Sequence, residues 1–177
     1  MKLKAGDNLI PFSITDSFGN TISTEEFRGV KFMISFFRYA ECLFCNLRVH
    51  ELIKNYPELE SEGLSIIAIF QSPKEDIDNN IGKLKPPFPM IPNRDRALYK
   101  QYGVVEHDMM GLFKGYMRWG KALRAFSKGH FIKRGKGSPS LIPADFLVNE
   151  DHTIHTAFYA TDISEHLPMK QIRAFLK

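Results

Sequence analysis

Two continuous apolar runs, residues 31–37 (KFMISFF) and 64–70 (LSIIAIF), stand out in the first half of the chain. Runs of this length are typical of strands that are buried on both faces of a sheet. Between them, apolar side chains recur at helical spacing from Cys45 to Leu59, and Gly63 ends the pattern. A strand, a helix and a second strand within about forty residues predict a βαβ unit, whose two strands run parallel.

Shorter alternating patterns lie on either side of this unit. Residues 10–15 and 20–23 surround a Gly-Asn step, which suits a tight turn and predicts a β-hairpin. Residues 144–148 and 153–159 surround the polar sequence NEDH and predict a second antiparallel pair. The sheet should therefore contain strands of both directions.

Proline and glycine mark the limits of the other elements. We expect a helix over residues 73–83, a shorter one over 94–102 and a last one over 168–176. Four prolines within residues 86–92 predict an extended linker, because proline blocks a helix and restricts the residue before it. The simplest arrangement of these elements is an α/β fold in which helices flank a mixed central sheet.

The composition is that of one globular domain. The chain has 177 residues, of which 44% are hydrophobic and 25% charged, so it can bury a full core and is not disordered. No stretch approaches the roughly 18 apolar residues of a membrane span. The N-terminus lacks the apolar region and cleavage site of a secretory signal. We therefore expect a cytoplasmic protein with no membrane partner.

The net charge of +4 is unevenly distributed. Residues 111–137 contain eight Lys and Arg and no acidic residue, so the rest of the chain carries a net charge of −4. Apolar residues recur at helical spacing in the same segment, which predicts an amphipathic basic helix ending near Gly129 within an insert at 106–138. This helix could contact nucleic acid, lie on a membrane surface, cover a site, or pack by its aromatic face. No RNA-binding signature accompanies it, so we expect no nucleic-acid partner.

The two cysteines of the chain lie in one tetrapeptide, Cys42-Leu43-Phe44-Cys45. Cys42 follows a buried strand and falls in the first turn of the next helix, where backbone N–H groups are unpaired and the helix dipole is positive. A thiolate is stabilised there, which lowers the cysteine's pKa. Cys45 lies one helical turn further, within reach of a disulfide. We therefore predict that Cys42 attacks a substrate and that Cys45, on the apolar face, resolves the product.

Two other interpretations of the cysteines stay open. A zinc site would need two further ligands, and the chain has no second Cys-x-x-Cys motif or paired histidines. The cysteines could also be structural residues of the core. A haem attachment site is excluded, because residue 46 is Asn where that motif requires His. A redox pair remains the preferred interpretation, and it requires no metal and no organic cofactor.

Several stretches together resemble the peroxiredoxin-like branch of the alkyl hydroperoxide reductase and thiol-specific antioxidant superfamily. They are KAGDNLIPFSITDSFGNTISTEEFRG, KFMISFFRYAECLFCNLRVHEL, GLSIIAIF, PPFPMIPNRDRALYKQYGV and PADFLVNEDHTIHTAFYATDISEHLP. The resemblance implies a single thioredoxin-like domain over residues 1–177, with an N-terminal β-hairpin extension and the basic helical insert at 106–138. It also implies thiol-based reduction of peroxides or disulfides.

The resemblance also assigns roles to single residues. Cys42 corresponds to the attacking cysteine and Cys45 to its partner in the chain. Pro143 matches the cis-proline loop that faces the cysteines in thioredoxin-like folds. Apart from the resemblance, Arg38 lies four residues before Cys42 at the end of the strand, where a guanidinium could lower the pKa of Cys42 and donate a hydrogen bond to a peroxide oxygen.

The chain departs from the peroxiredoxin pattern at two positions. Family members have Pro seven residues and Thr or Ser three residues before the attacking cysteine, and these positions hold Ser35 and Tyr39. The departures leave open a thiol-disulfide oxidoreductase without significant peroxidase activity. A binding or sensing module that uses the basic helix is a further alternative. For the redox enzyme, we expect a peroxide or disulfide substrate and a dithiol electron donor such as a thioredoxin-like protein, and a homodimer stays open.

Overall fold

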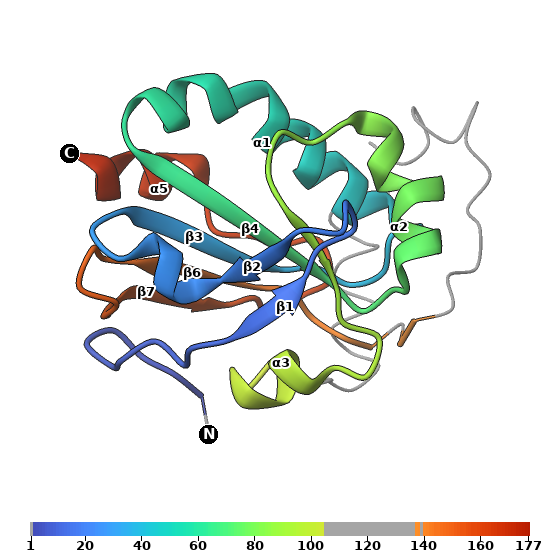
Figure 1. Ribbon diagram of the computed structural model, residues 1–177, viewed down its shortest axis with the longest axis horizontal. Helices are drawn as coiled ribbons and strands as arrows, with labels where there is room; N and C mark the ends of the chain where they lie inside the picture. Colours follow the sequence, from blue (N-terminus) through green and yellow to red (C-terminus); the bar gives the residue numbers. More distant parts are fainter. Residues whose placement is uncertain (1, 105–136, 139) are drawn as a thin grey trace.

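A five-stranded mixed sheet forms the centre of the molecule (Figure 1). The computed structural model describes residues 2–104, 137–138 and 140–177, so the predicted basic helix lies outside the described residues. The strand order is β5-β4-β3-β6-β7. The strands are β3 (Lys31–Phe36), β4 (Leu64–Phe70), β5 (Met90–Pro92), β6 (Ala144–Val148) and β7 (Ile154–Tyr159).

The central strand β3 carries the predicted βαβ unit. It runs parallel to β4, with Ile34 opposite Ile67, and antiparallel to β6, with Ile34 opposite Phe146. Helix α1 (Leu43–Ser61) connects β3 to β4. The sequence prediction of the βαβ unit and of the antiparallel β6–β7 pair is therefore confirmed.

Two groups of elements cover the sheet (Figure 1). Helices α1 and α5 (Met169–Leu176) pack on one face through residues such as Leu52 and Phe175. The hairpin of β1 (Ser13–Thr15) and β2 (Thr21–Ser23) packs on the other face together with α3 (Ala97–Gln101). The predicted N-terminal hairpin, the short helix and the last helix are confirmed.

The segment between β4 and α3 differs from its prediction. The expected helix over residues 73–83 divides at Asn80 into α2 (Lys74–Asn79) and the 3-10 helix η2 (Ile81–Leu84). The proline-rich linker contains β5, which pairs parallel to β4. Proline is tolerated in β5 because this strand lies at the edge of the sheet and needs hydrogen-bond donors on one side only.

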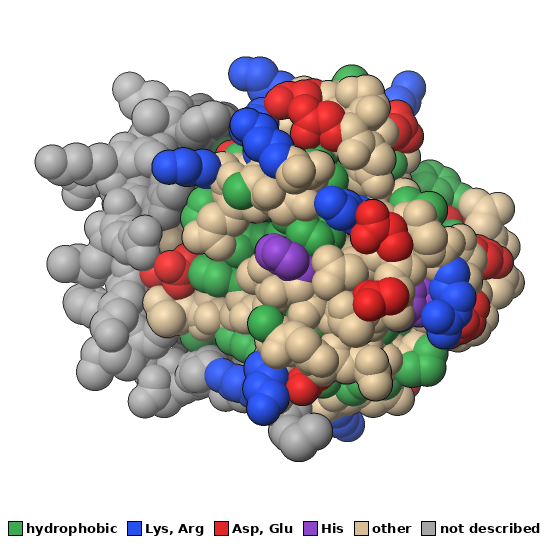
Figure 2. Space-filling model, turned by 90° about the vertical axis from the view of Figure 1, so that its left-hand side faces the viewer, with side chains coloured by type: hydrophobic (Ala, Val, Ile, Leu, Met, Phe, Trp, Pro, Cys, Tyr) green, Lys and Arg blue, Asp and Glu red, His purple; other side chains and the backbone are tan. Residues whose placement is uncertain are grey.

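The described surface carries charges of both signs. On the face shown in Figure 2, Lys and Arg side chains are interspersed with Asp and Glu side chains around a patch of apolar ones. Within the described ranges, no helix combines the length and the apolar character needed to cross a membrane.

Candidate active site

The connection between β3 and α1 builds the candidate site. It is tied to the end of β4 by two hydrogen bonds, from Gln71 N to the Arg38 carbonyl at 3.0 Å and from Ala40 N to Ser72 Oγ at 3.0 Å. Cys42 follows as the N-cap residue of α1. Because both ends of the connection are fixed by β3 and α1, its side chains are held close to the helix N-terminus.

Asn46 closes the turn that precedes the helix. Its side-chain Nδ2 donates to the carbonyls of Ala40 at 2.9 Å and of Cys42 at 2.8 Å. These bonds satisfy two carbonyl groups of the turn and fix the backbone of Cys42. The sequence analysis used Asn46 only to exclude a haem site. An amide side chain in the first helical turn can bond to nearby backbone groups, and this property could have indicated its role in the turn.

Arg38 and Cys42 are in direct contact. The Arg38 Nη1 donates a hydrogen bond to the Cys42 Sγ at 3.3 Å, and the Arg38 side chain is buried with 2% of the residue exposed. Burial alone would raise the pKa of Cys42. The hydrogen bond from the Cys45 side chain, the charge of Arg38 and the backbone N–H groups of Cys45 and Phe44 outweigh this effect and lower the Cys42 pKa to about 6.

Cys45 has the opposite electrostatic environment. It is fully buried, and burial, the hydrogen bond with Cys42 and the Cys42 charge raise its pKa well above the usual value. Both cysteines are free thiols. The structure therefore brings together one cysteine whose pKa is lowered and one whose pKa is raised.

Tyr39 and Gly137 form one side of the site. The Tyr39 ring lies under the Arg38 guanidinium, whose carbon is 5.0 Å from the ring centroid. A Cβ atom on Gly137 would lie 2.9 Å from the Tyr39 Cβ and 3.0 Å from the Gln71 side chain, so only glycine fits without a shift. The Gln71 amide also binds both backbone groups of Ser138, at 2.9 Å and 3.1 Å. The sequence analysis missed Gln71, since only the fold brings it to Ser138.

Pro143 differs from its expectation. The described residues contain no cis peptide bond, so the Ile142–Pro143 bond is trans and the predicted cis-proline is wrong. The Pro143 carbonyl accepts a hydrogen bond from Ala160 N at 3.1 Å, which fixes this turn without a cis bond. The ordinary trans preference of an X–Pro bond is therefore kept. Ile142 shares a core cluster with both cysteines.

Ser35, where the family has proline, is bonded within the core. Its hydroxyl donates a hydrogen bond to the buried carboxylate of Asp145, and His166 contacts the same carboxylate. The sequence analysis placed Asp145 in a strand and assigned it no role. The signal was a single acidic residue in the apolar run ADFLV.

The contacts of Cys42 support two-electron thiol chemistry. A buried thiolate with a guanidinium donor can attack an electrophilic oxygen or sulfur atom, and the adjacent thiol can close a disulfide. Among the residues that the structure describes, no group of three or more His, Cys, Asp or Glu side chains is arranged to hold a metal ion.

Comparisons with known proteins identify relatives that match most of the chain. The model of the AhpC/TSA family matches residues 5–157. Peroxiredoxin Bcp of Escherichia coli strain K12 is 24% identical over 152 residues, which cover 86% of this chain and 92% of that protein. The crystal structure of peroxidoxin BcpB from Mycobacterium tuberculosis superposes with a TM-score of 0.71 and 14% identity, covering 98% of this chain and 96% of the other. The thioredoxin domain of a Bacteroides vulgatus thiol-disulfide oxidoreductase has a TM-score of 0.60 and 17% identity, covering 99% of this chain and all of that one.

Proposed function

This chain belongs to the AhpC/TSA family as a peroxiredoxin-like thiol oxidoreductase with a thioredoxin-like fold, and we propose that Cys42 and Cys45 are its redox pair. The observation that carries the proposal is the hydrogen bond of 3.3 Å from the Arg38 guanidinium to the Cys42 sulfur. It stabilises the thiolate, which is the nucleophilic form of cysteine.

The first step is attack of the Cys42 thiolate on a peroxide. The sulfur binds the terminal oxygen, the O–O bond breaks, and the alkoxide or hydroxide that leaves takes up a proton. Cys42 becomes a sulfenic acid. Arg38 donates to the reacting sulfur, and its positive charge can stabilise the negative charge that develops on the oxygen.

In the second step Cys45 resolves the sulfenic acid. The Cys45 sulfur attacks the Cys42 sulfur, the S–O bond breaks, water leaves, and a Cys42–Cys45 disulfide forms. A dithiol donor, for which a thioredoxin-like protein is the natural candidate, then reduces the disulfide by thiol–disulfide exchange.

Stopped-flow measurement of hydrogen peroxide consumption tests the redox pair. We expect Cys42→Ser to abolish consumption. Cys45→Ser should keep a single turnover and lose steady-state activity with a dithiol donor, because its sulfenic acid has no resolving thiol. Equal rates for the wild type and both variants would refute the proposal.

A second candidate function is thiol–disulfide exchange without significant peroxidase activity. Tyr39 favours it, because the hydroxyl that the family places three residues before the cysteine is replaced by a ring packed against Arg38. Comparing the rates of hydrogen peroxide and protein-disulfide turnover by one preparation separates the two functions.

We also propose a single domain that includes the 106–138 insert, works in the cytoplasm, and needs neither nucleic acid nor a membrane. A thiol pair that works by cycling through a disulfide suits that compartment, where thiols are normally kept reduced. Limited proteolysis tests the single domain, cell fractionation tests the location, and size-exclusion chromatography with light scattering decides between a monomer and a homodimer.

A further inference from the structure

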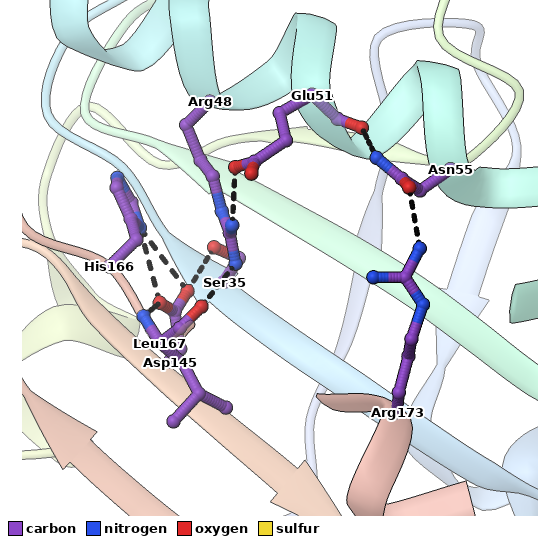
Figure 3. A network of polar contacts seen from close by, with 8 residues as sticks. All are labelled: Ser35, Arg48, Glu51, Asn55, Asp145, His166, Leu167 and Arg173. Atoms are coloured by element: carbon purple, nitrogen blue, oxygen red, sulfur yellow. Dashed lines mark hydrogen bonds and ion pairs between the residues drawn. The ribbon is translucent and has the colours of Figure 1, made fainter. Parts of the chain in front are cut away.

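A cluster of buried polar side chains lies between the sheet and helix α1 (Figure 3). Its centre is the Asp145 carboxylate on β6, which is fully buried. Oδ1 accepts a hydrogen bond from the Ser35 hydroxyl, and Oδ2 accepts one from Leu167 N at 2.7 Å. The His166 Nδ1 lies 3.1 Å from the same Oδ2. We call Ser35, Arg48, Asp145 and His166 the Asp145 cluster.

The carboxylate of this cluster is ionised. Burial alone would raise the pKa of Asp145, but the charge and hydrogen bond of His166, the charge of Arg48 and the Ser35 hydroxyl lower it to about 2. A buried charge is costly unless it is paired and hydrogen-bonded, and here every oxygen has a donor.

His166 presents a hydrogen-bond acceptor that the cluster does not use. A carboxylate beside Nδ1 holds the proton on that nitrogen, which leaves Nε2 with its lone pair in the neutral ring. This Nε2 is buried and has no hydrogen-bond partner within the described ranges, and the His166 side chain is only 5% exposed. An unpaired buried polar atom costs about 1–3 kcal/mol, so its retention calls for a role.

Two contacts join His166 to the elements that carry the cysteine pair. Its ring centroid lies 5.1 Å from that of Phe37, which directly follows β3 and precedes Cys42 by five residues. Arg48 lies three residues after Cys45 on α1, and its Nη2 donates to the carbonyl of Leu167 at 2.7 Å, directly after His166. Figure 3 shows the His166 ring beside the segment that leads from β3 into α1.

Cys45 needs a proton acceptor in order to react. Burial and the neighbouring Cys42 raise its pKa, so few molecules hold the Cys45 thiolate at neutral pH. Its thiol must therefore lose a proton to a base as the disulfide closes.

We propose that His166, oriented by Asp145, accepts the proton of the Cys45 thiol, directly or through one water molecule, when the Cys42–Cys45 disulfide forms. This inference rests on the redox pair proposed above. The proton moves from Cys45 to the His166 Nε2, and the Cys45 sulfur then attacks the Cys42 sulfur. The S–O bond of the sulfenic acid breaks, and the leaving hydroxide takes the proton from His166 as water. In the reverse direction, the protonated ring returns the proton to Cys45 as the disulfide is reduced.

The charged groups around His166 suit this role. Asp145 faces it from β6 and Arg48 lies across from it on α1, so one anion and one cation flank the ring. Its own loop adds Asp162 and Glu165, whose carboxylates accept hydrogen bonds from Ser164 and Thr161. The Asp145 carboxylate stabilises the imidazolium that forms on proton uptake.

The aromatic disulfide dithiobis(nitrobenzoate) separates attack by Cys42 from disulfide closure by Cys45 and needs no peroxide. Attack by Cys42 releases one coloured thiolate and leaves a mixed disulfide, and closure by Cys45 releases the second thiolate. We expect His166→Gln to leave the first release unchanged and to slow the second by about a hundredfold, as for loss of a general base. His50→Gln is the matched control on an exposed histidine of α1, and both of its releases should match the wild type.

A second release in His166→Gln as fast as in the wild type would overturn the inference. Loss of the first release would count against the redox pair instead, as would equal peroxide consumption by Cys42→Ser and the wild type. If His166→Gln does not fold, Asp145→Asn tests the same dyad. The wild-type pH profile provides a check without substitution. A second release whose rate rises tenfold per pH unit through pH 9 would mean that Cys45 ionises without such a base.

Discussion

Arg38 and the N-terminus of α1 stabilise the same negative charge from two sides. The guanidinium donates to the Cys42 sulfur at 3.3 Å, and the backbone N–H groups of Phe44 and Cys45 contribute further hydrogen bonds. Neither group needs a conformational change to reach the thiolate. The Cys42 thiolate, which is the attacking form in the proposed mechanism, is therefore stabilised before a substrate arrives.

Replacing Arg38 by Met should raise the pKa of Cys42 from about 6 by about one to two units. The change removes the charge and keeps the apolar stem, so the buried position stays filled. The rate of iodoacetamide alkylation against pH gives the midpoint directly. Arg28→Met, at an exposed arginine of the same length, is the control, and an unchanged midpoint in Arg38→Met would contradict the contact's role.

Asp145 should make the free energy of unfolding depend on pH in the acidic range. Its folded pKa of about 2 lies below the reference value of 3.8, so its contribution to stability is complete above pH 3.8 and is lost as the pH falls through 2. A shift of this size corresponds to about 2 kcal/mol. Urea unfolding from pH 5 to pH 2 should show a smaller loss of stability in Asp145→Asn than in the wild type. Parallel curves would show that Asp145 isn't the titrating group.

At the scale of elements, the ends of β3 and β4 hold the site together. Gln71 extends from the end of β4 to both backbone groups of Ser138, while its own N–H binds the Arg38 carbonyl. Gln71 therefore links the segment that enters β6 to Arg38, the residue that contacts Cys42.

Gln71→Ala should lower the free energy of unfolding by about 1–3 kcal/mol, because it removes two hydrogen bonds to half-buried backbone groups of Ser138. Urea unfolding measures the loss. Gln101→Ala is the matched control, since Gln101 is exposed at the end of α3 and should change stability by less than about 0.5 kcal/mol. Equal effects of the two substitutions would argue against the link.

Local sequence patterns were sufficient to predict most helices and strands, but not the pairings and contacts between residues far apart in the sequence. The runs KFMISFF and LSIIAIF predicted β3 and β4 because both faces of these strands are buried. Strand β5 was missed because its pairing with β4 is tertiary, while its prolines locally favour a linker. The same limit applies to the site: Cys42, Cys45 and Arg38 lie within eight residues, whereas Ser35 and Asp145 lie 110 residues apart.

At the scale of the molecule, the N-terminal segment completes the sheet. Gly6 N donates to the Ile154 carbonyl, Ile154 N to Asp7, and Leu9 N to His152, each at 2.8 Å. These bonds occupy part of the backbone edge of β7, the strand at one edge of the sheet. An open strand edge can pair with another chain, so the segment both adds core contacts and protects the edge.

Deletion of residues 1–9 should therefore lower stability and promote self-association. Leu3 and Leu9 are each 7% exposed, and burying a leucine side chain contributes about 1.5–3 kcal/mol, so we expect a loss of at least about 3 kcal/mol. Thermal unfolding measures the loss, and light scattering follows association through the exposed edge of β7. Deletion of residues 1–2 is the control, because it keeps both leucines and all three backbone bonds. A chain without residues 1–9 that melts like this control and stays equally monodisperse would show that β7 needs no cover.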